Sequence, residues 1–186
     1  MAEWGRKMEL MDKVQDVIEA PLSPEELAVR YRELCDDIRF SNLPGKIEID
    51  VWGRLVMSPA SNYHGTLQLR LGTLLETLGG QAQVEASVVT PAGVLVADVA
   101  WKSAEFMQAH AFETPYIRAP EICVEVTSPS NSAKELQEKV IAYITAGAQE
   151  VWIVYPRSKR IGFHGKQGLM DRSAYEVDLG GLFEKT

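Results

Sequence analysis

Two short apolar runs, each with a single carboxylate inside it, constrain this chain more than any other feature. Asp98 lies within residues 94–100 (VLVADVA), and Glu125 lies within residues 122–126 (ICVEV). Both runs are too short for a typical helix and rich in β-branched residues, which indicates buried strands of a sheet. An ionised carboxylate in such a strand is costly unless a cation, a metal ion or several donors stabilise it. Two of them in neighbouring strands favour a site for a divalent metal ion.

The pattern around these runs predicts a mixed α/β fold. A strand–helix–strand unit spans residues 121–155, and its two strands should be parallel because a crossover helix joins them. Ser23 and Ser132 each precede a glutamate by three residues, which indicates capping boxes at two helix starts. Strands are expected over residues 47–51, 55–57, 84–90, 94–101, 121–127, 151–155 and 161–164, the last at a sheet edge. Helices are expected over residues 4–20, from 24 to the turn at 42–45, over 63–78 and from about 132 to 147, with residues 102–119 irregular or partly helical.

The 186 residues fit one folding unit with an attached segment. Residues 1–44 are expected to form an N-terminal helical extension that packs on a core formed by residues 45–186. No apolar run reaches the ~18 residues needed to cross a bilayer. The first residues also lack the apolar core of a signal peptide, so a cytoplasmic protein with no membrane partner is predicted.

The charge of the chain limits how it can meet nucleic acid. The formal net charge is −7 and the pI is about 5.1, which argues against binding nucleic acid through bulk electrostatics. A metal site built from carboxylates contributes to this acidity by itself. The local run at residues 157–160 (RSKR) remains available to contact phosphate.

A lysine on the crossover helix supplies a third element of the candidate site. At 100° per residue, Lys139 lies at the edge of the apolar face of that helix, next to Ser132 and Tyr143. From there its stem can lie on the sheet and its ammonium can point toward the carboxylates. The alternative is a lysine that simply extends into solvent, and the alternative for each carboxylate is a strand end or an arginine partner. Lys134 lies on the opposite flank and is the weaker candidate.

Several segments resemble the Uma family of bacterial restriction-endonuclease-like proteins, within the PD-(D/E)XK nuclease superfamily. Residues 120–130 (PEICVEVTSPS) resemble its P-x-x-x-x-E-V-x-S-P-S pattern, and residues 95–99 (LVADV) resemble its x-x-P-D-V segment. The resemblance covers roughly residues 45 to 165. Further matches are Lys139, Tyr143, Gly147 and residues 150–156 (EVWIVYP) to "K…Y…AG…EYWLVDP", and residues 57–59 (MSP) with His64 to "M-S-P…H".

The resemblance implies a restriction-endonuclease-like mixed β-sheet flanked by helices, and a metal-dependent nuclease that hydrolyses DNA. Asp98 and Glu125 would then hold Mg²⁺ or Mn²⁺, and Glu48 would fill an outlying acidic position. The superfamily lysine two residues after the glutamate is replaced here by Thr127, which makes Lys139 its stand-in. Because restriction-type nucleases often pair two sites to cut both strands, a homodimer is also expected.

His64 has two readings. Its spacing to the leucines that follow places it on the inward face of the predicted helix, at the first turn. It is either a hydrogen-bonded core histidine or a member of the site, as the family resemblance implies.

Two rival functions remain open at this point. Ala97 replaces the usual proline and the E-x-K lysine is missing, which favours a catalytically inactive nuclease-fold module used for oligomer or partner binding. A real metal site that acts on a substrate other than DNA is the other rival. The spacing of Asp98 and Glu125 is a first test, since carboxylates more than ~8 Å apart cannot share one ion.

Overall fold

The computed structural model describes residues 20–40, 46–58, 61–129 and 131–184. The helix expected over residues 4–20 lies outside this part of the chain except for its last residue. The helices are α2 (Pro24–Asp36), α3 (Asn62–Glu76), α4 (Ala104–His110) and α5 (Ala133–Thr145). The strands are β1 (Lys46–Asp50), β2 (Leu55–Ser58), β3 (Gln81–Thr90), β4 (Gly93–Lys102), β5 (Ile122–Val126), β6 (Glu150–Tyr155), β7 (Arg160–Gly165) and β8 (Gly168–Met170).

The strands form one mixed eight-stranded sheet, which confirms the predicted fold class. The order is β2-β1-β4-β5-β6-β7-β8, with β3 paired to β4. Strands β5 and β6 are parallel, as the crossover predicts, and the other pairs are antiparallel. The prediction that residues 161–164 form an edge strand is wrong, because β8 pairs with β7 on its outer side. Three residues of β8 with no apolar alternation were too short a signal to find.

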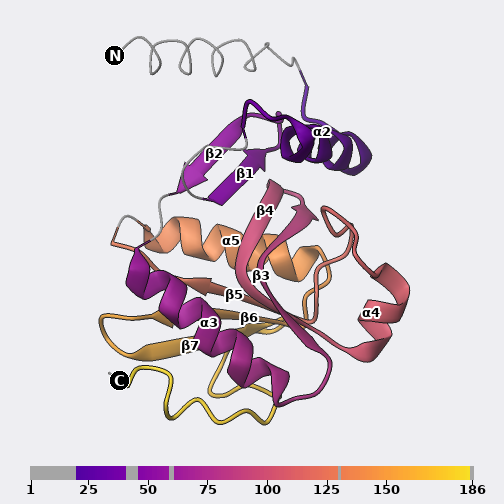
Figure 1. The fold of residues 1–186 in the computed structure, drawn as a ribbon. Helices are drawn as coiled ribbons and strands as arrows, with labels where there is room; N and C mark the ends of the chain where they lie inside the picture. Colours follow the sequence, from indigo (N-terminus) through magenta and orange to yellow (C-terminus); the bar gives the residue numbers. More distant parts are fainter. Residues whose placement is uncertain (1–19, 41–45, 59–60, 130, 185–186) are drawn as a thin grey trace.

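Helices cover both faces of the central strands (Figure 1). Leu67, Leu71 and Leu75 of α3 are fully buried in the same cluster as Val124 of β5. The next residue back along β5, Cys123, belongs to a second cluster, with α5. Since neighbouring strand residues point to opposite faces, α3 and α5 lie on opposite faces of the sheet.

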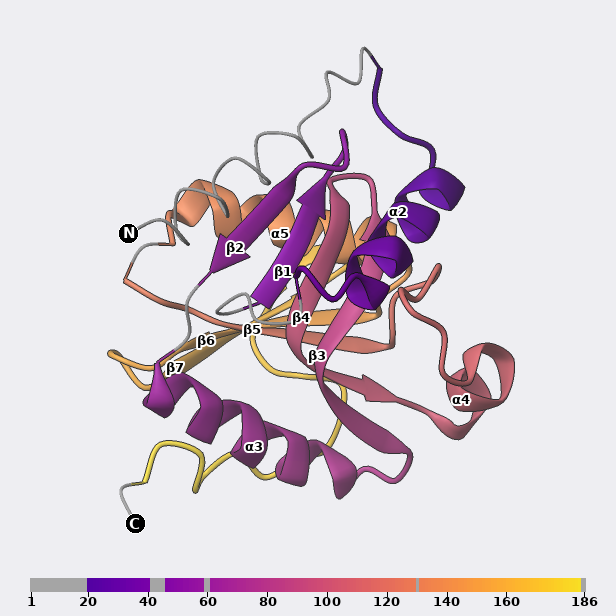
Figure 2. The same cartoon turned by 45° about the horizontal axis from the view of Figure 1, so that its top comes forward.

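Helix α2 packs at the end of the sheet formed by β1, β3 and β4 (Figure 2). Its N-terminus carries the predicted capping box, since Ser23 and Glu26 exchange side-chain-to-backbone hydrogen bonds. The second predicted box, Ser132 with Glu135, begins α5. The division at residue 44 stays a prediction. No helix among the described residues is both long enough and apolar enough to span a membrane.

Gly93, at the start of β4, is a position where only glycine fits. Its φ is +117°, and a Cβ added there would lie 2.1 Å from the Ile49 carbonyl oxygen. We expect Gly93→Ala to lower the free energy of unfolding by at least about 2 kcal/mol, measured by chemical denaturation. Gly65 in α3 has nothing within 4 Å of its added Cβ, so Gly65→Ala should be neutral or stabilising by up to about 1 kcal/mol. Equal stabilities for the two variants would contradict the close approach.

Candidate active site

The pairing of β4 with β5 brings the two lone carboxylates together. The antiparallel ladder ends at Val99 opposite Val124, and the next residue on each strand is Asp98 and Glu125. Beyond that point Oδ2 of Asp98 accepts a hydrogen bond of 2.7 Å from the backbone N–H of Val126. The predicted adjacency of these strands is therefore confirmed. Where the site begins, the Asp98 side chain takes the place of a backbone hydrogen bond between the strands.

Strand β1 contributes to the site because it parts from β4. The two strands pair at Ile49 with Val94. At Val96, side chains of β1 rather than its backbone bond to the backbone of β4. Oε1 of Glu48 accepts from the Val96 N–H at 2.9 Å, and the Lys46 ammonium donates to the Val96 carbonyl at 2.6 Å. This exchange holds both charged side chains against the strand that bears Asp98.

Lys46, which the sequence did not single out, lies among all three carboxylates. Its Nζ is 3.0 Å from Oδ1 of Asp98, 3.6 Å from Oε2 of Glu125 and 3.7 Å from Oε1 of Glu48. A signal was present in the sequence, since Lys46 precedes Glu48 by two residues and strand neighbours at that spacing share a face. The predicted strand began one residue too late, at residue 47, and so left Lys46 out.

Helix α5 supplies a second ammonium and a hydroxyl. Nζ of Lys139 lies 2.9 Å from Oε1 of Glu48 and 3.2 Å from Oε2 of Glu125. One turn later, the Tyr143 hydroxyl donates to Oε1 of Glu125 at 2.8 Å. The sequence indicates Tyr143 as a residue of the apolar face and as a match to the family pattern, but not as a site residue, because a tyrosine ring gives the same periodicity as any core residue. Lys134 is exposed and lies 3.7 Å from Glu138, away from the cluster.

His64 lies at the first turn of α3 and faces the cluster from the other side. Its Nε2 is 3.2 Å from Oδ1 of Asp98, and its backbone N–H is capped by Ser61. One turn further along α3, the Gln68 amide donates to the Asp98 carbonyl at 3.3 Å. The two interpretations of His64, a hydrogen-bonded core histidine and a member of the site, are therefore compatible, since its hydrogen-bond partner is the candidate site residue Asp98.

Burial and charge push the two central carboxylates in opposite directions. Burial alone raises the pKa of Asp98, but the hydrogen bond from His64 and the charge of Lys46 outweigh it and lower the pKa to about 2. Burial dominates at Glu125 and raises its pKa, although Lys139 and Lys46 oppose the shift. Burial also disfavours the Lys46 ammonium, yet the three carboxylates overcome this and raise its pKa. Asp98 and Lys46 are therefore both charged at neutral pH.

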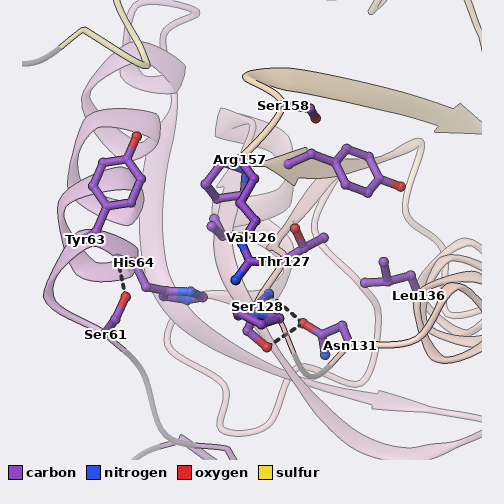
Figure 3. A pocket seen from close by; sticks show the side chains of 13 residues that line it. Ser61, Tyr63, His64, Val126, Thr127, Ser128, Asn131, Leu136, Arg157 and Ser158 are labelled. Atoms are coloured by element: carbon purple, nitrogen blue, oxygen red, sulfur yellow. Dashed lines mark hydrogen bonds between the residues drawn. The ribbon is translucent and has the colours of Figure 1, made fainter.

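A cavity of about 660 Å³ opens beside the cluster. His64 and Val126 line it (Figure 3). Both residues contact the Asp98 carboxylate, so the cavity is separated from Asp98 by its own hydrogen-bond partners. Tyr63, Tyr155 and Arg157 also line the cavity. Arg157 belongs to the run that the sequence offered as a phosphate contact, and it has no ion-pair partner in the part of the chain described. The cavity thus brings aromatic rings and one cation together with His64, the partner of Asp98.

Known proteins with a similar sequence or fold are described as nucleases. The family model described as "Uma2: Putative restriction endonuclease" matches residues 29–178. The chain belongs to this family. Among solved structures, "a putative nuclease belonging to DUF820" from Anabaena variabilis ATCC 29413 is similar, with a TM-score of 0.59 and 15% sequence identity. The match covers 87% of this chain and 91% of that chain. No curated protein matches this sequence.

The Uma2 match contains every residue of the cluster, from Lys46 to Tyr143. The match confirms the family resemblance found in the sequence. It extends the matched range from roughly residues 45 to 165 to residues 29–178. The structural neighbour, at such low identity, shows the shared fold alone.

The donors in this Uma2 chain suit a hard divalent cation. Asp98 Oδ1 and Glu125 Oε2 lie 3.0 and 3.6 Å from one Lys46 nitrogen, so their separation cannot exceed the sum of these distances. That limit is below the ~8 Å beyond which two carboxylates cannot share an ion. Among the residues described, no group of three or more histidine, cysteine, aspartate or glutamate side chains is arranged to hold a metal ion. A magnesium-type site needs only one or two carboxylates, with waters and substrate phosphate completing the shell.

Proposed function

We propose that this Uma2 protein is a metal-dependent nuclease that hydrolyses DNA phosphodiester bonds. One observation carries the proposal, namely that buried Asp98 and Glu125 converge on a single cationic position next to an open cavity. A buried carboxylate costs free energy when it has no partner, so two that converge on one point favour a site that binds a cation. Asp98 and Glu125 would hold Mg²⁺ or Mn²⁺. When bound, the ion would polarise the scissile phosphate and lower the pKa of a water molecule.

The remaining residues of the cluster take supporting roles. The Lys139 ammonium, 3.2 Å from Glu125, would stabilise the negative charge that develops on the phosphate. Glu48 would position Lys139 through their 2.9 Å ion pair. His64 would orient Asp98 and keep it ionised, and Tyr143 would orient Glu125.

The cavity indicates how an acidic protein can meet DNA. With a net charge of −7, the surface as a whole repels a polyanion, so contact has to be local. Arg157 would contact a phosphate next to the scissile one, and Tyr63 or Tyr155 would contact a sugar or base. A homodimer would give each DNA strand its own site, as expected from restriction-type nucleases.

One observation favours the inactive-module alternative. Two lysines already neutralise most of the charge of the three carboxylates, so the cluster needs no metal ion to balance its charge. In that case the chain would keep the nuclease fold and act through partner contacts.

A cleavage assay separates the two functions. Plasmid DNA and labelled single- and double-stranded oligonucleotides are incubated with the protein in Mn²⁺, in Mg²⁺ or in EDTA. We expect strand scission with either metal and none in EDTA. Intact DNA in every metal, with protein in excess over substrate, would overturn the DNA nuclease and leave the inactive module or a metal site that acts on another substrate.

A further inference from the structure

The Lys46 ammonium lies where a cation shared by Asp98 and Glu125 would bind. Its Nζ contacts both carboxylates, and only 10% of the side chain is exposed. Lys139 differs in this respect, because its ammonium contacts Glu48 and Glu125 and has no contact with Asp98. A metal ion between Asp98 and Glu125 therefore competes with Lys46 for one position, whereas it has no such conflict with Lys139.

A second cavity gives the Lys46 side chain another place to go. The residues that line this cavity of about 190 Å³ include Lys46, Tyr31 and Glu85. This volume is many times the roughly 10–15 Å³ that one water molecule requires, so an ammonium group fits in the cavity. The side chain can thus leave the carboxylates without passing into a packed core.

Glu85 is suited to receive the displaced ammonium. It interrupts the β3–β4 ladder between the pairs Val84–Val99 and Ala86–Ala97, so it lies across from Asp98. Its φ of +53° is unusual for a residue other than glycine. Its side chain is exposed and has no ion-pair partner among the described residues. Because Glu85 and Lys46 line the same cavity, this carboxylate offers a counter-ion to an ammonium that moves into it.

We propose that Lys46 holds the metal position in the metal-free protein, and that a divalent cation binds by displacing it toward Glu85. This inference rests on the proposed function, because it concerns the ion that the nuclease would use. The lysine keeps the buried carboxylates paired when no metal is bound, and removing one partner from such a cluster is strongly destabilising. The cost of moving Lys46 then weakens metal binding, so that substrate phosphate is needed to complete a tight site.

Calorimetric titration with Mn²⁺ tests the displacement without any cleavage assay. Lys46→Met should lower the Mn²⁺ dissociation constant at least about tenfold, since it removes the competitor. Lys139→Met is the matched control, because it removes the same charge from the same cluster but does not clear the position between Asp98 and Glu125. Its gain in affinity should be clearly smaller than that of Lys46→Met.

Glu85→Gln provides a second arm that leaves the cluster intact. It removes the receiving carboxylate, so the Mn²⁺ dissociation constant should rise about two- to fivefold, the range for a partly exposed ion pair. Glu76→Gln, at the far end of α3, removes an equal exposed charge and should leave the constant unchanged.

Each outcome decides between the claims. Tight Mn²⁺ binding by wild type that neither Lys46→Met nor Glu85→Gln changes overturns the displacement but leaves the nuclease standing. Equal gains for Lys46→Met and Lys139→Met also overturn it, because charge alone then accounts for the effect. No binding by wild type or by Lys46→Met, even with a non-cleavable DNA analogue present, removes the metal site itself, and the proposed function with it. If Lys46→Met does not fold, the comparison of Glu85→Gln with Glu76→Gln decides alone.

Discussion

Glu125→Gln is expected to lower DNA cleavage at least about 10³-fold and to weaken Mn²⁺ binding strongly, while the protein stays folded. The amide keeps nearly the same shape and can still accept the hydrogen bond from the Tyr143 hydroxyl. It carries no charge, so one of the two candidate metal ligands is lost. Burial raises the pKa of Glu125. Both lysines keep another carboxylate as partner, Asp98 for Lys46 and Glu48 for Lys139. The neutral replacement should therefore cost less stability than the loss of either lysine. Single-turnover cleavage and thermal denaturation measure the two effects separately.

Glu150 offers a matched control on the neighbouring strand. It is as buried as Glu125, and its carboxylate accepts hydrogen bonds of 2.7 Å from Trp152, Ser173 and Ala174. Glu150→Gln should cost about 1–3 kcal/mol of stability, since an amide cannot accept all of these bonds. Cleavage and metal binding should remain. If Glu125→Gln kept cleavage within tenfold of wild type, or if Glu150→Gln lost as much, Glu125 would have no special role.

Lys139→Met is expected to give the next largest effect, a loss of about 10²- to 10³-fold in the cleavage rate at saturating Mn²⁺. Methionine keeps most of the apolar stem but not the ammonium that lies between Glu48 and Glu125. Metal affinity should hold or increase, because a positive charge leaves the neighbourhood of the carboxylates. The split between a lower rate and an undiminished metal affinity marks a residue that acts on the reacting phosphate.

Lys134→Met is the control for this prediction. Lys134 lies on the same helix, and its exposed side chain pairs with Glu138 at 3.7 Å. Its replacement should change neither the rate nor the affinity. A rate for Lys139→Met within about threefold of Lys134→Met would show that the ammonium only balances buried charge.

The central part of the site was predictable because it rests on local patterns. A lone carboxylate in a β-branched run stands out in the sequence, and the crossover places the strands of Glu125 and Trp152 side by side. The capping box at Ser132 fixes the start of α5, and helical periodicity then directs Lys139 to the sheet. Each of these steps needs only residues that are close in the sequence.

Lys46 and Glu85 could not be found in the same way. Lys46 meets Asp98 across 52 positions of sequence, at the point where β1 and β4 part. Periodicity shows which face of the sheet a side chain lies on. It does not show where two strands stop pairing, or which unpaired backbone groups then bond to side chains. The positive φ of Glu85 likewise has no signal in the sequence, because glutamate is not a residue type that favours this conformation. The outer strand β8 was missed because three residues hold no period.

The measurement that tests the account most directly is a calorimetric titration of Mn²⁺ into the wild type and into an Asp98→Ala/Glu125→Ala variant shown to be folded. The account predicts binding in the wild type and none in the variant, because the two carboxylates are the ligands. Equal binding by both proteins would place the metal elsewhere and contradict the site. Absence of binding to the wild type, in the presence of a non-cleavable DNA analogue and millimolar metal, would contradict the metal-dependent nuclease itself.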